Sequence, residues 1–260
     1  MQLVSRAERS LISLRSLAMR TLAVSLFLLA LCALGCCETQ LNGLPGCTID
    51  KLEACGTDYV IYANTTNLPV EGESFTQQCR LILEQLSCSI AFCRRCLSGF
   101  PRAVALLGLR SAEEFYEESC DLSTDLYQSY KVHVKCLNKA GKGLNERLNK
   151  VLQRLYAIKE TVRTREKIGH ACCLYPEFLH DTAAIISKQC PDPEVKEFFH
   201  GFMERIFGEL LGVACGKYRE GSENCRRIQP VTPSEAVKAK AKNFVEPMLD
   251  IVHSLGSRGR

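Results

Sequence analysis

Apolar side chains recur at helical spacing along most of the chain from about residue 47 onward. The clearest stripe runs through residues 74–97 and stays within about 40° of one direction at 100° per residue, which predicts a strong amphipathic helix. Gly99 and Pro101 end this helix and restart the chain. The stripe is made of Phe75, Cys79, Ile82, Leu86, Cys93 and Leu97.

Further helices follow from the same spacing. Residues 47–63 show a shorter helical period through Leu52, Cys55 and Tyr59. Ser111 with Glu114 is typical of a capping box, and predicts a helix start whose period continues to Leu137. Two glycines, Gly141 and Gly143, predict a break before another helix over residues 144–162.

The C-terminal half repeats these signals. Residues 168–190 are apolar on more than one side, so we expect this helix to be central. Asp192 and Pro193 predict a capped helix start, and Thr232 to Glu235 predict a last helix over about residues 237–251. Its apolar face either docks on the domain or, with Lys238 and its neighbours, lies on a membrane or a partner groove. The tail 254–260 is predicted to be disordered.

Composition supports the same fold class. Tryptophan is absent, aromatic residues make up 7% of the 260, and helix formers dominate. We therefore predict an all-α, disulfide-stapled single domain of about six to eight helices. It spans residues 38–228, and an amphipathic helix with a tail occupies 229–260.

Residues 1–37 are typical of a signal peptide, with a possible alternative start at Met19. The apolar run of residues 22–34 follows Arg15 and Arg20, and small residues come directly after it. The run is shorter than the roughly 20 residues that a spanning helix needs, so no stable membrane span is predicted. An uncleaved anchor and a bacterial lipoprotein box are weaker alternatives. Cleavage after Gly35, after Cys36 or after Cys37 would each follow a small residue. We favour Glu38 as the first mature residue.

Sixteen cysteines indicate an oxidising, extracellular location, because a reducing cytosol keeps few idle thiols. Thirteen remain after the predicted cleavage. Cys93 lies in the middle of an apolar stripe, so we predict it to be the unpaired thiol, inert in the core. The alternative is that Cys93 forms an intermolecular disulfide. We favour a monomer over such a covalent dimer. Adjacent Cys172 and Cys173 point about 100° apart on a helix, so they bridge most easily to two different segments. The twelve predicted disulfide cysteines are Cys47, Cys55, Cys79, Cys88, Cys96, Cys120, Cys136, Cys172, Cys173, Cys190, Cys215 and Cys225.

Charge and motifs exclude several function classes. The formal charge is +4, of which the predicted signal peptide supplies +3, so nothing indicates a nucleic-acid partner. No HExxH, GxSxG, GxGxxG or Walker-type run occurs, and we predict neither an enzyme nor a bound cofactor or metal. Cys173 and His180 share a helix side, but a bridged cysteine and a structural histidine are the favoured interpretation. The acidic run Glu113 to Glu118 is interpreted as a solvated helix face.

Two candidate sites remain. Phe199, Phe202 and Ile206 belong to an unusually bulky helix that could line an apolar ligand cavity, although core packing explains the bulk equally well. Asn64 opens the sequon Asn64-Thr65-Thr66 and is a predicted glycosylation site.

The cysteine order resembles that of a set of secreted arthropod proteins without an assigned function. The resemblance covers most of residues 47–228 through Cys47-x7-Cys55, Asn64-Thr65-Thr66-Asn67-Leu68-Pro69, Cys79, Cys88-x7-Cys96, Phe115-Tyr116-x3-Cys120, Cys136-Leu137-Asn138, Cys172-Cys173, Cys190, Cys215 and Cys225. In kind, the chain is also similar to insect hemolymph glycoproteins of about 27 kDa. Relatives of this type often carry a further cysteine pair near Gly143 and His180, whereas Cys93 is extra here. The resemblance implies secretion and a helical disulfide framework, and it supplies no catalytic residues.

The sequence therefore predicts a secreted, non-catalytic binding or carrier protein for an unknown extracellular ligand or protein, with an apolar ligand between the helices. The alternative is a secreted signalling or effector protein that acts through a protein surface.

Overall fold

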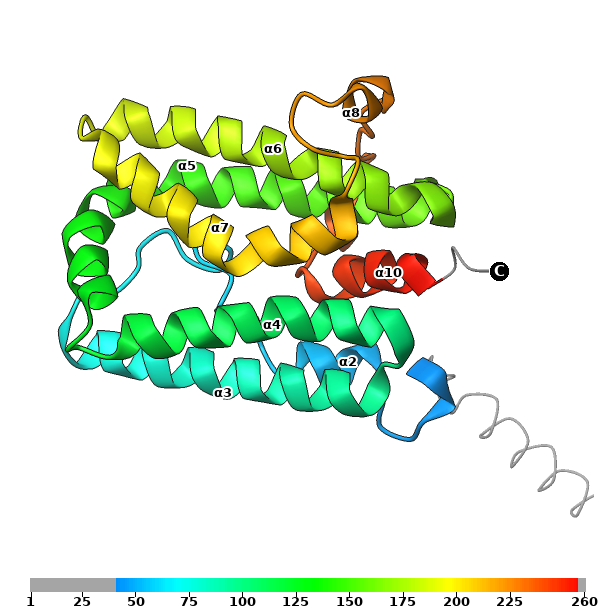
Figure 1. Ribbon diagram of the computed structural model, residues 1–260, viewed down its shortest axis with the longest axis horizontal. Helices are drawn as coiled ribbons and strands as arrows, with labels where there is room; N and C mark the ends of the chain where they lie inside the picture. Colours follow the sequence, from blue (N-terminus) through cyan, green and yellow to red (C-terminus); the bar gives the residue numbers. More distant parts are fainter. Residues whose placement is uncertain (1–40, 257–260) are drawn as a thin grey trace, which may run out of the picture. The chain divides into compact units, whose positions relative to one another are not determined.

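The computed structural model describes residues 41–256; the predicted signal peptide lies outside this range. Within it the chain is all helical and has no β-strand (Figure 1). Six of the α-helices are longer than ten residues, which agrees with the predicted fold class. The elements are the 3-10 helix η1 (Leu41–Gly43) and the α-helices α2 (Ile49–Glu53), α3 (Gly72–Cys96), α4 (Gly99–Cys120), α5 (Asp125–Thr161), α6 (Thr164–Gln189), α7 (Pro193–Cys215), α8 (Glu223–Arg227), α9 (Glu235–Lys240) and α10 (Val245–Gly256).

Several helix starts follow from side-chain caps. The Asp192 carboxylate accepts a hydrogen bond from the Glu194 backbone N–H at 2.9 Å, and Pro193 occupies the first turn of α7, as predicted. Ser234 caps α9 by accepting from the Val237 N–H at 3.3 Å. These short contacts satisfy N–H groups that would otherwise lack a partner at the helix ends.

The predicted boundary at Ser111 is wrong. The helix α4 runs through this residue without interruption, and the Ser111 hydroxyl donates to the Leu107 carbonyl at 3.1 Å, one turn back in the same helix. The chain instead breaks after Cys120, and Thr124 caps the start of α5, because its hydroxyl oxygen accepts from the Tyr127 N–H at 3.1 Å. A capping box is a local signal, and here the apolar face of α4 continues across it.

The predicted break at Gly141 and Gly143 is also wrong, because both glycines lie inside the 37-residue helix α5. A Cβ at Gly141 would lie 2.0 Å from the Thr66 carbonyl oxygen and 3.1 Å from the Tyr62 ring. A Cβ at Gly143 would lie 2.9 Å from Cγ2 of Ile185 on α6. The glycines therefore allow neighbouring segments to approach the helix closely, which sequence spacing does not reveal.

The two ends of the described chain differ from the expectation. The helix predicted over residues 47–63 is reduced to α2, and the following loop places Tyr62 at a φ of 59°. The single C-terminal helix is divided into α9 and α10, and Asn243 begins the second one by accepting from the Val245 N–H at 2.9 Å. Ser254 and Leu255, predicted to belong to a disordered tail, are buried in α10.

Two helix pairs form the body of the domain. The helices α3 and α4 pack together along their length, and so do α5 and α6 (Figure 1). The helix α7 packs against α4, α5 and α6, and α10 lies between α4 and α6. The main apolar core therefore forms where the two pairs and α7 face one another. The helix α6 packs against α5, α7 and α10, so it is central, as predicted from its wide apolar face.

Six disulfides staple the helices, with Cα–Cα distances of 5.3 to 5.9 Å. The paired residues are the twelve predicted ones, and Cys93 is a buried free thiol. Cys172 and Cys173 bond to two different segments, the end of α7 and α8, as their directions on α6 suggested. The bridges are Cys47–Cys96, Cys55–Cys88, Cys79–Cys120, Cys136–Cys190, Cys172–Cys215 and Cys173–Cys225.

Candidate ligand cavity

The three predicted ligand-binding residues lie on one face of α7. Phe199, Phe202 and Ile206 are all buried, and all three line an apolar cavity of about 340 Å³. The Phe202 ring is also held in an edge-to-face contact by Phe115 of α4, with the ring centres 4.6 Å apart. The bulky residues of α7 thus serve both as core and as cavity wall, so the two interpretations of this helix are not exclusive.

Small residues explain why space is left between the helices. On α4 the residues Ala105, Gly108 and Ala112 recur at helical spacing and face the cavity. Ala171 of α6 and Ala214 of α7 line it as well. Because these side chains end at or before Cβ, the large residues of α7 do not fill the volume between the helix pairs.

A loop before α3 closes another side. Tyr59, in the loop before α3, lines the cavity, and its carbonyl accepts a hydrogen bond from the Tyr116 hydroxyl at 2.8 Å. The side chain of Asn138 on α5 makes two hydrogen bonds to the backbone of Leu68 in the same loop, each at 2.8 Å. Its amide oxygen accepts from the Leu68 N–H, and its amide N–H donates to the Leu68 carbonyl. Asn145 donates to the carbonyl of Tyr62 at 2.7 Å. Polar side chains of α4 and α5 therefore hold the loop in place.

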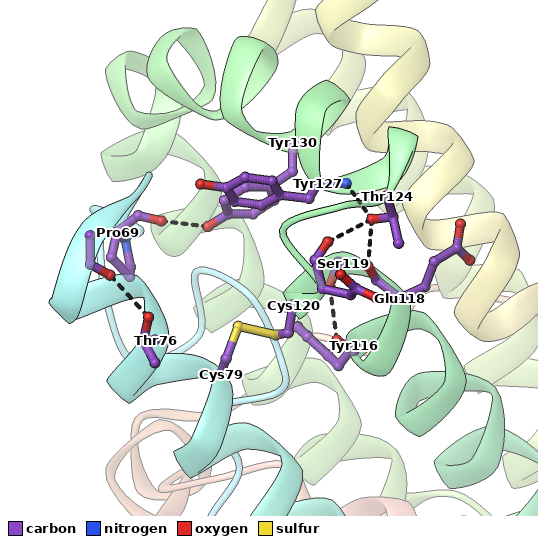
Figure 2. Close-up of a disulfide and its surroundings, with 12 residues drawn as sticks. Pro69, Thr76, Cys79, Tyr116, Glu118, Ser119, Cys120, Thr124, Tyr127 and Tyr130 are labelled. Carbon is purple, nitrogen blue, oxygen red and sulfur yellow. Dashed lines mark hydrogen bonds between the residues drawn. A yellow bond between two sulfur atoms is a disulfide. The ribbon is translucent and has the colours of Figure 1, made fainter.

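The disulfides divide the cavity wall into separately stapled parts. Three bridges join residues 47–120, three join residues 136–225, and within the described chain none links the two groups. Figure 2 shows the junction, where Cys79–Cys120 ends the first group and the Thr124 hydroxyl donates to the Glu118 carbonyl at 2.7 Å. The cavity is lined from both groups, so no disulfide joins its opposite walls across it.

The helix α10 forms a wall that follows the last disulfide. Its residues Met248, Leu249 and Ile251 line the cavity. Two ion pairs attach it, Lys167–Asp250 at 2.6 Å and Lys159–Glu246 at 2.7 Å. The apolar face of α10 is thus docked on the domain, which leaves no continuous apolar stripe for a membrane or a partner groove.

Cys93 lies in the same wall, close to Tyr59 and Ser89. Burial raises the pKa of its thiol to about 11. A thiol with this pKa is protonated at neutral pH and is a poor nucleophile. The position is therefore that of an inert core cysteine.

Other candidate residues are not brought together. Cys173 is bonded to Cys225, as the favoured interpretation of the sequence had it, so it does not form a reactive pair with His180. Of the acidic run, Glu113 pairs with Arg110 and Glu118 with Arg205. Among residues 41–256 no group of three or more histidines, cysteines or carboxylates is arranged to hold a metal.

The sequon and the membrane prediction bear on location. Asn64 is exposed, and its side-chain N–H donates to Asp58 at 3.2 Å. No described helix is both long and apolar enough to cross a membrane. The six disulfides indicate an oxidising environment.

Sequence reasoning missed most of the wall, namely Tyr59, Tyr175, the small residues of α4 and the face of α10. The spacing of Ala105, Gly108 and Ala112 was an available signal, because small residues on an inward helix face leave room.

No protein-family model, curated protein or solved structure matches this chain.

Proposed function

We propose that the protein is a secreted, non-catalytic carrier that binds an apolar small molecule in the cavity between its helix pairs. The cavity is the observation that carries this proposal. Its volume of about 340 Å³ is within the range of about 300 to 1,000 Å³ for ligand sites. Almost all of its wall is hydrocarbon, with the phenylalanines of α7 on one side and the small residues of α4 on the other.

Energetics favour an occupied cavity. The wall is almost entirely hydrocarbon, and removing apolar surface from water is favourable by about 25 cal/mol per Å². A bound hydrocarbon would cover this surface and so stabilise the folded protein.

The disulfide pattern is compatible with ligand entry. Among the described residues no disulfide joins the two stapled groups or α10 across the cavity, so the walls can separate while every disulfide stays intact. The six bridges then keep each part folded during opening.

Titration with the fluorescent probe 1-aminonaphthalene, which matches the size of the cavity, tests the proposal. The variant Gly108→Leu partly fills the cavity, because it adds four carbon atoms, on the order of 100 Å³, to a wall of the 340 Å³ volume. A Cβ at Gly108 would lie 3.1 Å from Cδ2 of Leu210, which borders the cavity and has room to move. We expect at least tenfold weaker probe binding.

The matched control is Gly201→Leu. This glycine also lies within a helix, but nothing is within 4 Å of its Cβ position and it does not line the cavity. Both variants gain helix propensity, so only the filling of the cavity distinguishes them. Equal affinity in the two variants, or no probe binding by the native protein, would refute the carrier proposal. Native mass spectrometry of the secreted protein should also show a bound small molecule.

A further inference from the structure

The cavity wall carries no charge. None of its lining residues is Asp, Glu, Lys, Arg or His. Its polar groups are the hydroxyls of Thr57, Tyr59, Ser89 and Tyr175 and the thiol of Cys93. A charged ligand group would therefore lose its hydration without gaining an ion-pair partner, which strongly disfavours its binding.

Two hydroxyls of this wall are buried without a hydrogen-bond partner among the described residues, those of Ser89 on α3 and Tyr175 on α6. Ser89 lies beside the Tyr59 side chain, so Tyr175 is the hydroxyl without another wall hydroxyl next to it. The Tyr175 ring is placed by Phe207 of α7, with the ring centres 6.2 Å apart. A buried hydroxyl without a partner is costly, so a ligand oxygen that accepts a hydrogen bond from it would be favoured at this position.

The ionisable groups of the wall are neutral at physiological pH. Burial raises the pKa of Tyr175 above its ordinary value, and the negative charge of Glu204 acts in the same direction. Burial also raises the pKa of Tyr59 and that of Cys93. The nearby Glu204 carboxylate would in addition repel an anion placed at the Tyr175 hydroxyl.

We propose that the cavity selects an electrically neutral, largely hydrocarbon ligand with one oxygen acceptor, such as an alcohol, ester or ketone, which accepts a hydrogen bond from Tyr175. This inference rests on the proposed carrier function and specifies its ligand class. At about 30 Å³ per water-sized group, 340 Å³ holds on the order of eleven non-hydrogen atoms. A ten-carbon chain with a small polar end fits this size.

Displacement of 1-aminonaphthalene by 1-decanol and by decanoate tests the inference, because the two ligands share a chain length and differ in charge. At pH 7.4 we expect decanol to bind at least 100-fold more tightly. Decanoate affinity should rise on the order of 100-fold from pH 7.4 to pH 5, since the neutral fraction of a carboxylic acid with a pKa near 4.3 rises by that factor. Decanol affinity should not change over this range.

The variant Tyr175→Phe tests the position of the oxygen. Loss of one hydrogen bond should weaken decanol binding about fivefold to tenfold and leave the affinity for 1-aminonaphthalene unchanged, since this probe carries no oxygen. Tyr127→Phe is the control, because Tyr127 does not line the cavity, and it should change neither affinity.

The outcomes separate the two proposals. Decanoate that binds as tightly as decanol at pH 7.4, or a Tyr175→Phe variant with unaltered decanol affinity, would overturn the neutral-ligand inference while the carrier proposal stands. A protein that binds neither the probe nor decanol would overturn the carrier proposal itself.

Discussion

Gly141 is the position where adding a single methyl group should be most harmful. It lies inside α5, where glycine is ordinarily unfavourable relative to alanine by about 1 kcal/mol. In Gly141→Ala the new Cβ would lie 2.0 Å from the Thr66 carbonyl oxygen, which is backbone and cannot rotate away. The loop that carries Thr66 must therefore move by more than about 1 Å, a displacement large enough to disturb its hydrogen bonds.

The expected cost follows from the contacts that hold this loop. Overpacking of a well-packed site costs about 1 to 3 kcal/mol. Displacement of the loop also weakens its hydrogen bonds to Asn138 and Asn145, each worth about 1 kcal/mol. After the gain in helix propensity, we expect Gly141→Ala to lower the free energy of unfolding by about 3 kcal/mol. The midpoint of thermal unfolding should fall by about 6 to 12 °C for a domain of this size.

Thermal and guanidinium unfolding with the disulfides intact, followed by circular dichroism, measures this change. Two further alanine variants give a graded comparison. At Gly201 the space is open, so Gly201→Ala should stabilise the protein by up to about 1 kcal/mol. At Gly143 the neighbour is the Ile185 side chain, which can shift, so the effect of Gly143→Ala should lie between the other two. A Gly141→Ala protein as stable as Gly201→Ala would show that the loop does not approach α5 as described.

Two other changes test the packing. Burial raises the pKa values of Tyr62, Tyr116 and Tyr130 above the ordinary value near 10, so these phenols ionise first in the unfolded chain. The stability that they contribute is therefore complete below pH 10 and is lost as the pH rises further. Guanidinium unfolding at pH 7, 9 and 10.5 should show this decline in the free energy of unfolding. Asp250→Asn leaves the mostly buried Lys167 without its charged partner and should lower the free energy of opening of α10 by about 2 kcal/mol. We expect faster hydrogen exchange over residues 245–256 and unchanged exchange in α3. Unchanged exchange over residues 245–256 would contradict the role of this ion pair.

Much of the fold follows from local sequence. The stripe of α3 and the Asp192-Pro193 start of α7 were predicted correctly because the period and the cap act within a few residues of each other. The prediction that Cys93 is unpaired rested on its place in the middle of an apolar stripe, and Cys93 is a buried free thiol. The stripe alone did not decide this, because Cys79 belongs to it and is bonded to Cys120. The glycines of α5 were misinterpreted, because their role depends on residues about 75 and 42 positions away in the chain.

The sequence by itself determined the helical class, the set of bridged cysteines and the bulky face of α7 around Phe199, because spacing and side-chain type are local properties. Only the tertiary structure decided which cysteines pair, that α10 docks, and that small residues of α4 face the phenylalanines across an unfilled volume. The reason is physical: a cavity is a deficit of volume shared among several helices, and it exists only once their separations and orientations are set.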